Sequence, residues 1–191
     1  LLMADRRIGG NDKINNKMLL FDEMTMAQIM AGFPTLYGIP HQLLPVFLVS
    51  EIDQLTCIPY IDAVESFGLP ADTCPVPTSE CGALVIDALP HLGSCYISSS
   101  MPCDGSLGAA LFMDRYMKKL PSFTLTPPQR FNEPETNAYA VKDLKNCIRF
   151  IEETYHVKWD WDAFWEKAEE YKRQMKDAFT TSFLSAYGQM V

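Results

Sequence analysis

The stretch from residue 94 to residue 125 constrains the fold of this chain more than any other. Its residues predict a strand over Ser94–Ser99, a helix that ends near Leu120, and a second short strand over Ser122–Leu125. A strand, a loop, a helix and a strand in this order form the repeating unit of a parallel β-sheet. We therefore predict an α/β fold with a parallel sheet of the Rossmann or flavodoxin type, in which ligands bind at the carboxyl ends of the strands.

Two helices are predicted around a loop that contains three prolines. Apolar residues at three-residue spacing predict a helix over Gln54–Phe67, with Gly68 as its C-cap. After the prolines, Thr78 or Ser79 is expected to cap the next helix. Cys74 would then lie in a stiff loop just before a helix N-terminus, where the helix dipole stabilises a thiolate.

The last third of the chain is predicted to be helical. A helix begins near Glu133, residues 156–159 interrupt it, and Asp160 is a good N-cap for a final helix rich in aromatic residues. The apolar stripe of the first of these helices consists of Val141, Leu144, Ile148, Ile151 and Tyr155. We interpret the pair as a helical hairpin of residues 131–191 that follows an α/β domain of residues 1–130. Because the sequence lacks an initiator Met and ends within a helical pattern, we expect a fragment of a two-domain subunit, with a second α/β domain beyond the hairpin.

The composition argues against several classes of protein. The net charge is −8, whereas proteins that bind nucleic acids are usually basic. No apolar stretch approaches the roughly 18 residues of a membrane helix, and the charged N-terminal residues do not form a signal peptide. We therefore expect a cytoplasmic protein whose six cysteines are reduced thiols. The sequence also lacks the glycine-rich motifs that bind ATP or dinucleotides.

Two of the six cysteines are candidate metal ligands. Cys74 and Cys103 each lie in a proline-containing loop that precedes a predicted helix, and Cys103 also follows a predicted strand. Two thiolates in such loops can meet above one edge of a sheet and hold iron. The alternative is that both are structural, because buried cysteines are common. The remaining cysteines, which we assign to the core, are Cys57, Cys81, Cys95 and Cys147.

Three polar residues beside these loops are candidates for a role in chemistry. Glu80, Ser99 and Ser100 could contact a substrate or transfer a proton. The alternative interpretation is that such side chains only cap helices or place a carboxylate in a first turn, and for Asp104 we favour it. The histidines show no metal-ligand spacing.

Three segments together resemble a known family. They are residues 68–75 (GLPADTCP), residues 98–106 (SSSMPCDGS), and the helical region from residue 141 (VKDLKNCIRFIEE) to residue 162 (KWDWD). In order and spacing they are similar to component D of the 2-hydroxyacyl-CoA dehydratases, a family that also includes the benzoyl-CoA reductase subunits. The resemblance covers roughly residues 60–180.

The resemblance implies an oxygen-sensitive enzyme of two subunits that carry [4Fe-4S] clusters. An ATP-dependent activator protein would inject one electron, and the acyl-CoA substrate would lose its hydroxyl group through a ketyl radical to give an enoyl-CoA. Cys74 and Cys103 would be cluster ligands, and a third cysteine would come from a C-terminal α/β domain. Their two sulfurs are then expected in one cavity, within about 6–7 Å of each other. A benzoyl-CoA-reductase-like subunit and a non-catalytic scaffold are the alternatives.

Overall fold

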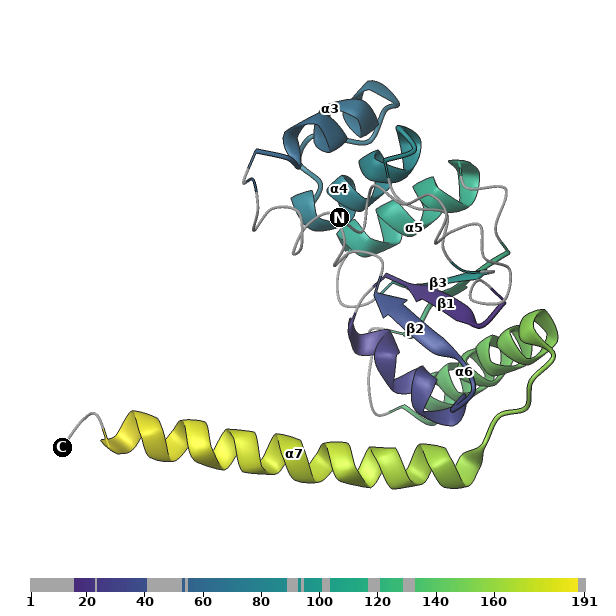
Figure 1. Ribbon diagram of the computed structural model, residues 1–191, viewed down its shortest axis with the longest axis vertical. Coiled ribbons are helices and arrows are strands. Elements are labelled where there is room, and N and C mark those ends of the chain that lie inside the picture. Colours follow the sequence, from purple (N-terminus) through teal and green to yellow (C-terminus); the bar gives the residue numbers. More distant parts are fainter. Residues whose placement is uncertain are drawn as a thin grey trace.

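The computed structural model contains a parallel β-sheet with helices on both faces (Figure 1). It describes residues 16–22, 24–40, 53, 55–88, 93, 95–100, 104–116, 121–128 and 133–188. The strands are β1 (Met18–Phe21), β2 (Tyr37–Pro40), β3 (Cys95–Ser99) and β4 (Ser122–Leu125). The helices are the 3-10 helix η1 (Met24–Gly32) and the α-helices α3 (Ile58–Ser66), α4 (Pro75–Val85), α5 (Asp104–Tyr116), α6 (Pro134–Tyr155) and α7 (Trp161–Gly188).

The described strands form one sheet with the order β2-β1-β3-β4, and every neighbouring pair is parallel. Leu19 in β1 pairs with Gly38 in β2 and with Cys95 in β3. On the other side of β3, Tyr96 pairs with Ser122 at the start of β4. The predicted α/β fold with a parallel sheet is thus confirmed, and the predicted bounds of β4 are those observed.

Alternating side chains of the strands face two separate cores. On one face, Leu19 and Ile97 pack with buried residues of η1 and α6. On the other face, Leu20 and Tyr96 pack with buried residues of α3, α4 and α5. Each fully buried large apolar side chain stabilises the fold by about 1.5–3 kcal/mol, so both helical layers are needed to hold the short strands together.

Two strands lie where no strand was predicted. The sequence analysis assigned no strand at the residues of β1 or β2. Each is only four residues long, and the pairing that makes it a strand is not visible in its own sequence. The charged N-terminal residues considered in the sequence analysis lie outside the described residues.

The N-terminus of α4 corrects one expectation. The helix begins at Pro75 with Cys74 as its N-cap residue, rather than at Thr78 or Ser79. Prolines are accommodated in a first helical turn because their missing N–H groups would have no partner there. The hydroxyl groups of Thr78 and Ser79 instead donate to the carbonyl oxygens four residues earlier, at 2.8 and 2.7 Å.

The preceding helix, α3, also differs from the prediction at its start. It begins at Ile58, and Cys57, which was assigned to the core, is its half-buried N-cap residue. At its other end Gly68 has φ +100°, a conformation that favours glycine, so the predicted end of the helix is confirmed.

α6 and α7 follow each other as expected, but they make different contacts. The second half of α6 packs on the sheet through Cys147, Ile148 and Ile151, whereas Val141 and Leu144 are exposed, so the predicted stripe is buried only in part. The backbone N–H of Ala163 donates to the Asp160 carboxylate at 2.9 Å, which confirms that N-cap. The hairpin and the division of the chain near residue 130 stay predictions.

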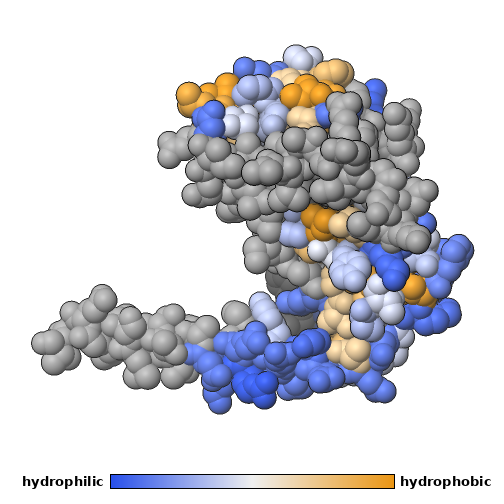
Figure 2. Space-filling model, in the orientation of Figure 1, coloured by the Kyte–Doolittle hydropathy of each residue, from blue (hydrophilic) through white to orange (hydrophobic). Residues whose placement is uncertain are grey.

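α7 is joined to the rest of the molecule through its first turn. The Asp160 N–H donates to the Gly32 carbonyl of η1 at 2.9 Å, and the Trp159 ring packs edge-on against Phe33. Figure 1 shows α7 extending from this point away from the sheet. Its described part carries mainly hydrophilic residues, whereas apolar residues gather over α3 (Figure 2).

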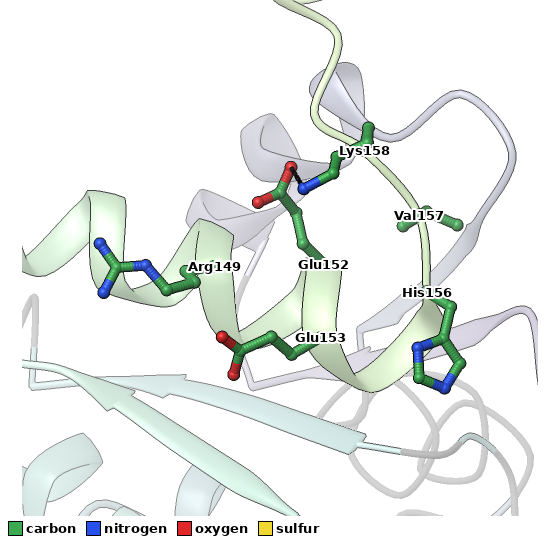
Figure 3. Close-up of a pocket in the computed structure, with 6 residues that line it drawn as sticks. All are labelled: Arg149, Glu152, Glu153, His156, Val157 and Lys158. Atoms are coloured by element: carbon green, nitrogen blue, oxygen red, sulfur yellow. Dashed lines mark ion pairs between the residues drawn. The ribbon is translucent and has the colours of Figure 1, made fainter.

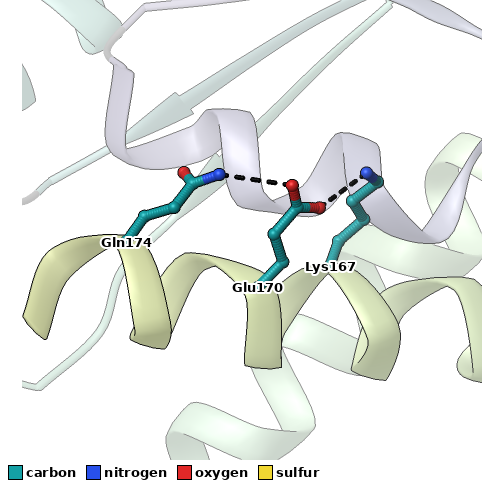
Figure 4. A network of polar contacts seen from close by, with 3 residues as sticks. All are labelled: Lys167, Glu170 and Gln174. Atoms are coloured by element: carbon teal, nitrogen blue, oxygen red, sulfur yellow. Dashed lines mark hydrogen bonds and ion pairs between the residues drawn. The ribbon is translucent and has the colours of Figure 1, made fainter. Parts of the chain in front are cut away.

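The surface of α7 is held by side-chain contacts along the helix. Lys167 donates to the Glu170 carboxylate at 2.7 Å, and the Gln174 amide donates to the same carboxylate at 3.2 Å (Figure 4). Such exposed contacts contribute little to stability and are screened by salt. Among the described residues, no helix combines the length and apolar composition needed to span a membrane.

Candidate site at the carboxyl edge of the sheet

The strand order places a topological switch point between β1 and β3, at their carboxyl ends. From β1 the chain crosses to β2 on one side, and from β2 it returns over β1 to β3 on the other side. The helices that follow β1 and β3, η1 and α5, therefore lie on opposite faces of the sheet. In doubly wound α/β folds this position is where ligands bind.

Asp22 connects the two strands at this position. It directly follows β1, is 2% exposed, and accepts a hydrogen bond from the Ser99 N–H through Oδ2 at 2.8 Å. Its own N–H donates to the Ile97 carbonyl at 3.1 Å. The sequence analysis did not single out Asp22, although a carboxylate directly after an apolar run of strand length is a usable signal for the end of a parallel strand.

The end of β3 is also fixed from its other side. The Ser100 N–H donates to the Leu125 carbonyl at 2.8 Å, and the hydroxyls of Ser98 and Thr124 lie 2.7 Å apart. Ser98 and Ser99 are buried and Ser100 is half-buried. Because side chains alternate along a strand, Ser99 shares the face of Ile97 and η1, so its hydroxyl lies on the face opposite to α4 and α5.

Glu80 lies behind β3, on α4, and is fully buried. The Tyr96 hydroxyl donates to Glu80 Oε1 at 3.2 Å. Burial raises the pKa of Tyr96 well above its ordinary value, and the negative charges of Glu80 and Asp22 raise it further. The hydrogen bond from Tyr96 to Glu80 joins α4 to β3.

Cys74 is exposed at the N-terminus of α4. Pro75 and Pro77 have no N–H, which leaves Val76 as the residue with a backbone donor among the first three helical positions. The helix dipole still favours a thiolate here, but with fewer direct hydrogen-bond donors than at an ordinary helix N-terminus. Cys103 lies outside the described residues, directly before the start of α5.

Three cysteines are buried in the two cores, as expected. Burial raises the pKa of the Cys95 and Cys147 thiols to about 12, and it also raises that of Cys81, with a further contribution from the Glu80 charge. These groups stay protonated near neutral pH, whereas metal binding requires a thiolate. Cys81 Sγ lies 3.7 Å from the Ala109 carbonyl oxygen and so marks the contact between α4 and α5.

Comparison with known families shows to which family this chain is related. Residues 56–182 match the family described as 2-hydroxyglutaryl-CoA dehydratase, D-component. The chain belongs to this family. Its members are dehydratase-type subunits that act within assemblies of several components. No curated protein matches the chain closely enough to be compared with it.

The dehydratase match covers both candidate ligand loops, including the segment of Cys103. The family is known to include components that contain iron–sulfur groups. Of the described cysteines, Cys74 has the exposure and the position that a cluster ligand needs. No group of three potential metal ligands gathers among the residues that the structure describes. The donor chemistry of the Cys74 thiol is compatible with an iron–sulfur group.

A separate polar depression lies at the opposite end of the sheet. It is lined by Arg149, Glu152, Glu153, His156, Val157 and Lys158 (Figure 3). Glu152 and Lys158 form an ion pair at 3.7 Å, with Lys158 largely exposed. The adjoining Tyr155 hydroxyl donates to the carbonyl of Met18, the first residue of β1, which places the depression near the amino edge of the sheet. It is therefore separate from the candidate site beside Asp22.

Proposed function

We propose that the chain is the iron–sulfur subunit of a 2-hydroxyacyl-CoA dehydratase, with Cys74 and Cys103 as ligands of one [4Fe-4S] cluster. The observation that carries the proposal is that Cys74 caps α4 and the β3–α5 connection contains Cys103, both within the region that matches the family. The reaction would remove water from a 2-hydroxyacyl-CoA after one-electron activation, through a ketyl radical. The partners would be a second dehydratase subunit and an ATP-dependent activator, in the cytoplasm.

The contact between α4 and α5 supports a shared site for the two cysteines. Cys74 precedes Cys81 by seven residues, and Cys103 precedes Ala109 by six. At about 1.5 Å per residue along a helix, Cys74 lies roughly 10 Å, and Asp104, the first residue of α5, roughly 8 Å, toward the N-terminus from the contact between the two helices. α5 leads from the carboxyl end of β3 to the start of β4, so its N-terminus faces the carboxyl edge. Because packed helices are about 8–10 Å apart, this contact supports, for helices that run in the same direction, a common edge for Cys74 and the start of α5, which Cys103 directly precedes in the sequence.

The cluster would supply one electron of low potential to the thioester, while the protein residues hold the substrate and handle protons. Glu80, Ser99 and Ser100 remain our candidates. Ser100, which is half-buried and follows the last residue of β3, has the position best suited to contact a substrate. Glu80 is fully buried and accepts a hydrogen bond from the Tyr96 hydroxyl, so we expect it to act on the site indirectly, through Tyr96.

Cysteine replacement tests the cluster part of the proposal. The full-length chain is purified without oxygen together with its partner subunit. Cys74→Ala or Cys103→Ala should abolish the visible absorbance of the cluster assigned to this chain and all dehydration. Cys57→Ala and Cys147→Ala are the controls, because Cys57 is a half-buried helix cap and Cys147 belongs to the core. A variant without Cys74 or Cys103 that keeps a full cluster would refute this ligand assignment.

The substrate class requires a separate assay. The intact complex is incubated with activator and ATP, and with either a 2-hydroxyacyl-CoA or benzoyl-CoA. We expect formation of an enoyl-CoA from the first substrate and no reduction of the second. Ring reduction would identify a benzoyl-CoA-reductase-like subunit, and no turnover of either thioester would favour a non-catalytic relative.

A further inference from the structure

We propose that α7 pairs with α7 of a second copy of this chain, with the two helices antiparallel. The helix has 28 residues, which at 1.5 Å per residue makes it about 42 Å long, more than the diameter of a small domain. Among the described elements it contacts mainly η1, and from that contact it extends away from the sheet (Figure 1). This inference goes beyond the proposed function and does not depend on the cluster.

One face of α7 carries aromatic side chains that are exposed in the described structure. Five apolar residues follow the i, i+3, i+4, i+7 and i+10 spacing of a single helix face, namely Trp161, Phe164, Trp165, Ala168 and Tyr171. Trp161, Trp165 and Tyr171 are 50%, 56% and 48% exposed. Covering aromatic side chains removes much apolar area from water, so this face is suited to pack against another helix.

The charges of α7 indicate which helix that is. Residues 162–170 contain four carboxylates and one lysine, a balance of −3, and residues 171–177 contain three cations and one carboxylate, a balance of +2. Two antiparallel copies bring the acidic segment of each helix beside the basic segment of the other, whereas parallel copies bring like charges together. Charges beside an apolar seam determine the partner and the orientation of paired helices.

This division of charge is not explained by the helix itself. The helix dipole acts within the first and last turns, whereas Glu166, Glu169 and Glu170 lie beyond the first turn, and the last turn contains no basic residue. Within the helix, Lys167 pairs with Glu170 and Lys172 with Glu169, each at 2.7 Å. Such pairs need both signs of charge at a spacing of three residues, but they do not need an acidic segment followed by a basic one.

Charge reversal tests both the pairing and its orientation. Glu166→Lys with Glu169→Lys makes the acidic segment basic, and Arg173→Glu with Lys176→Glu makes the basic segment acidic. In an antiparallel dimer of either variant, like charges face each other. In an equimolar mixture of the two variants, opposite charges face each other again, so the mixture should associate although neither variant does so alone.

The measurement is sedimentation equilibrium of the full-length chain alone, under reducing conditions and at low ionic strength. The wild type should be a dimer. Each α7 variant should raise the dissociation constant of the dimer about tenfold or more, and the mixture should restore it to within about threefold. The matched control is Asp62→Lys with Glu65→Lys, which makes the same charge change at the same spacing on α3 and should have no effect. Circular dichroism checks that every variant is folded.

A wild type that is monomeric up to about 100 µM overturns the inference, and so does one that uses α7 only to bind a different subunit. Variants that dimerise like the wild type also overturn it, and mixing that strengthens association beyond the wild type would indicate parallel helices. Should a lysine variant fail to fold, Glu166→Gln with Glu169→Gln takes its place. It should still weaken the dimer, and an unchanged dissociation constant would contradict the pairing.

Discussion

Several ionisable side chains are buried in the two cores of this protein. Cys95 and Cys147 belong to one core and Cys81 to the other, and Tyr96 lies beside Glu80. Each thiol and the phenol are neutral in the folded protein up to a higher pH than in the unfolded chain, because burial disfavours the charged form. Alkaline pH therefore destabilises the folded protein through these buried groups.

We predict that stability falls as the pH rises from about 9 to about 12. Burial raises the pKa of Cys95 and Cys147 from 9.0 to about 12, so above pH 9 the unfolded state has lost protons that the folded state retains. The stabilisation is complete below the unfolded pKa and is lost by about 1.4 kcal/mol per pH unit for each such group. Urea unfolding under reducing conditions at pH 8 and pH 10 measures the loss. Cys147→Ala should show a shallower decline, and an equal or steeper decline would contradict the assignment.

At the residue scale, the sequence predicted where a residue lies relative to a helix or strand better than it predicted the burial and the hydrogen-bond partners of that residue. The placement of Cys74 before a helix N-terminus follows from its prolines, and the structure has it there. The full burial of Glu80 could not be predicted, because it depends on Tyr96, sixteen residues away in the next strand. Asp22 was missed for a related reason, since its partner Ser99 is 77 residues away.

Among the elements, α3 and α4 form the tightest contact. The backbone of Tyr60 in α3 lies so close to Gly82 in α4 that a Cβ atom on Gly82 would overlap it. A backbone cannot move aside as the end of a flexible side chain can. Glycine at this position is therefore required by the packing of the two helices, and its backbone conformation gives no separate reason.

We predict that Gly82→Ala destabilises the protein despite the higher helix propensity of alanine. Overpacking typically costs about 1–3 kcal/mol, which exceeds the gain of up to about 1 kcal/mol from replacing glycine in a helix. Gly108→Ala in α5 is the control, because nothing lies within 4 Å of the position of its added Cβ. Thermal unfolding should show a lower melting temperature for the first variant and an equal or higher one for the second. Equal behaviour of the two would show that α3 and α4 can move apart.

Element prediction succeeded where local signals are strong. Asp160 caps α7 and β4 has its predicted bounds, since a capping residue and a short segment bounded by prolines act locally. The strands β1 and β2 were missed because their four residues become strands only through pairing with each other and with β3. The prediction for α6 failed for a similar reason. A periodic apolar pattern does not indicate where the neighbouring sheet ends, so it could not predict that half of the apolar stripe of α6 is exposed.

At the scale of the whole molecule, β1 is one of the two inner strands of the described sheet. It pairs with β2, the next strand in the sequence, and with β3, which follows much later. We predict that in refolding the amides of Leu19 and Leu20 gain protection together with those of Tyr96 and Ile97. Pulsed hydrogen exchange with mass spectrometry measures the two segments separately. Early protection of β1 with β2 alone would contradict this order.

The distance in sequence between β1 and β3 also has a consequence during synthesis on the ribosome. Leu19 pairs with Cys95, so the inner edge of β1 has no partner strand until 76 further residues have been made. At about 5–20 residues per second this takes roughly 4–15 seconds, during which an apolar strand of the nascent chain can pair with other chains. The hydrogen bond between Asp22 and Ser99 forms only after that interval. This contact at the carboxyl edge of the sheet is thus completed late, and β1 can pair with other chains until β3 has emerged.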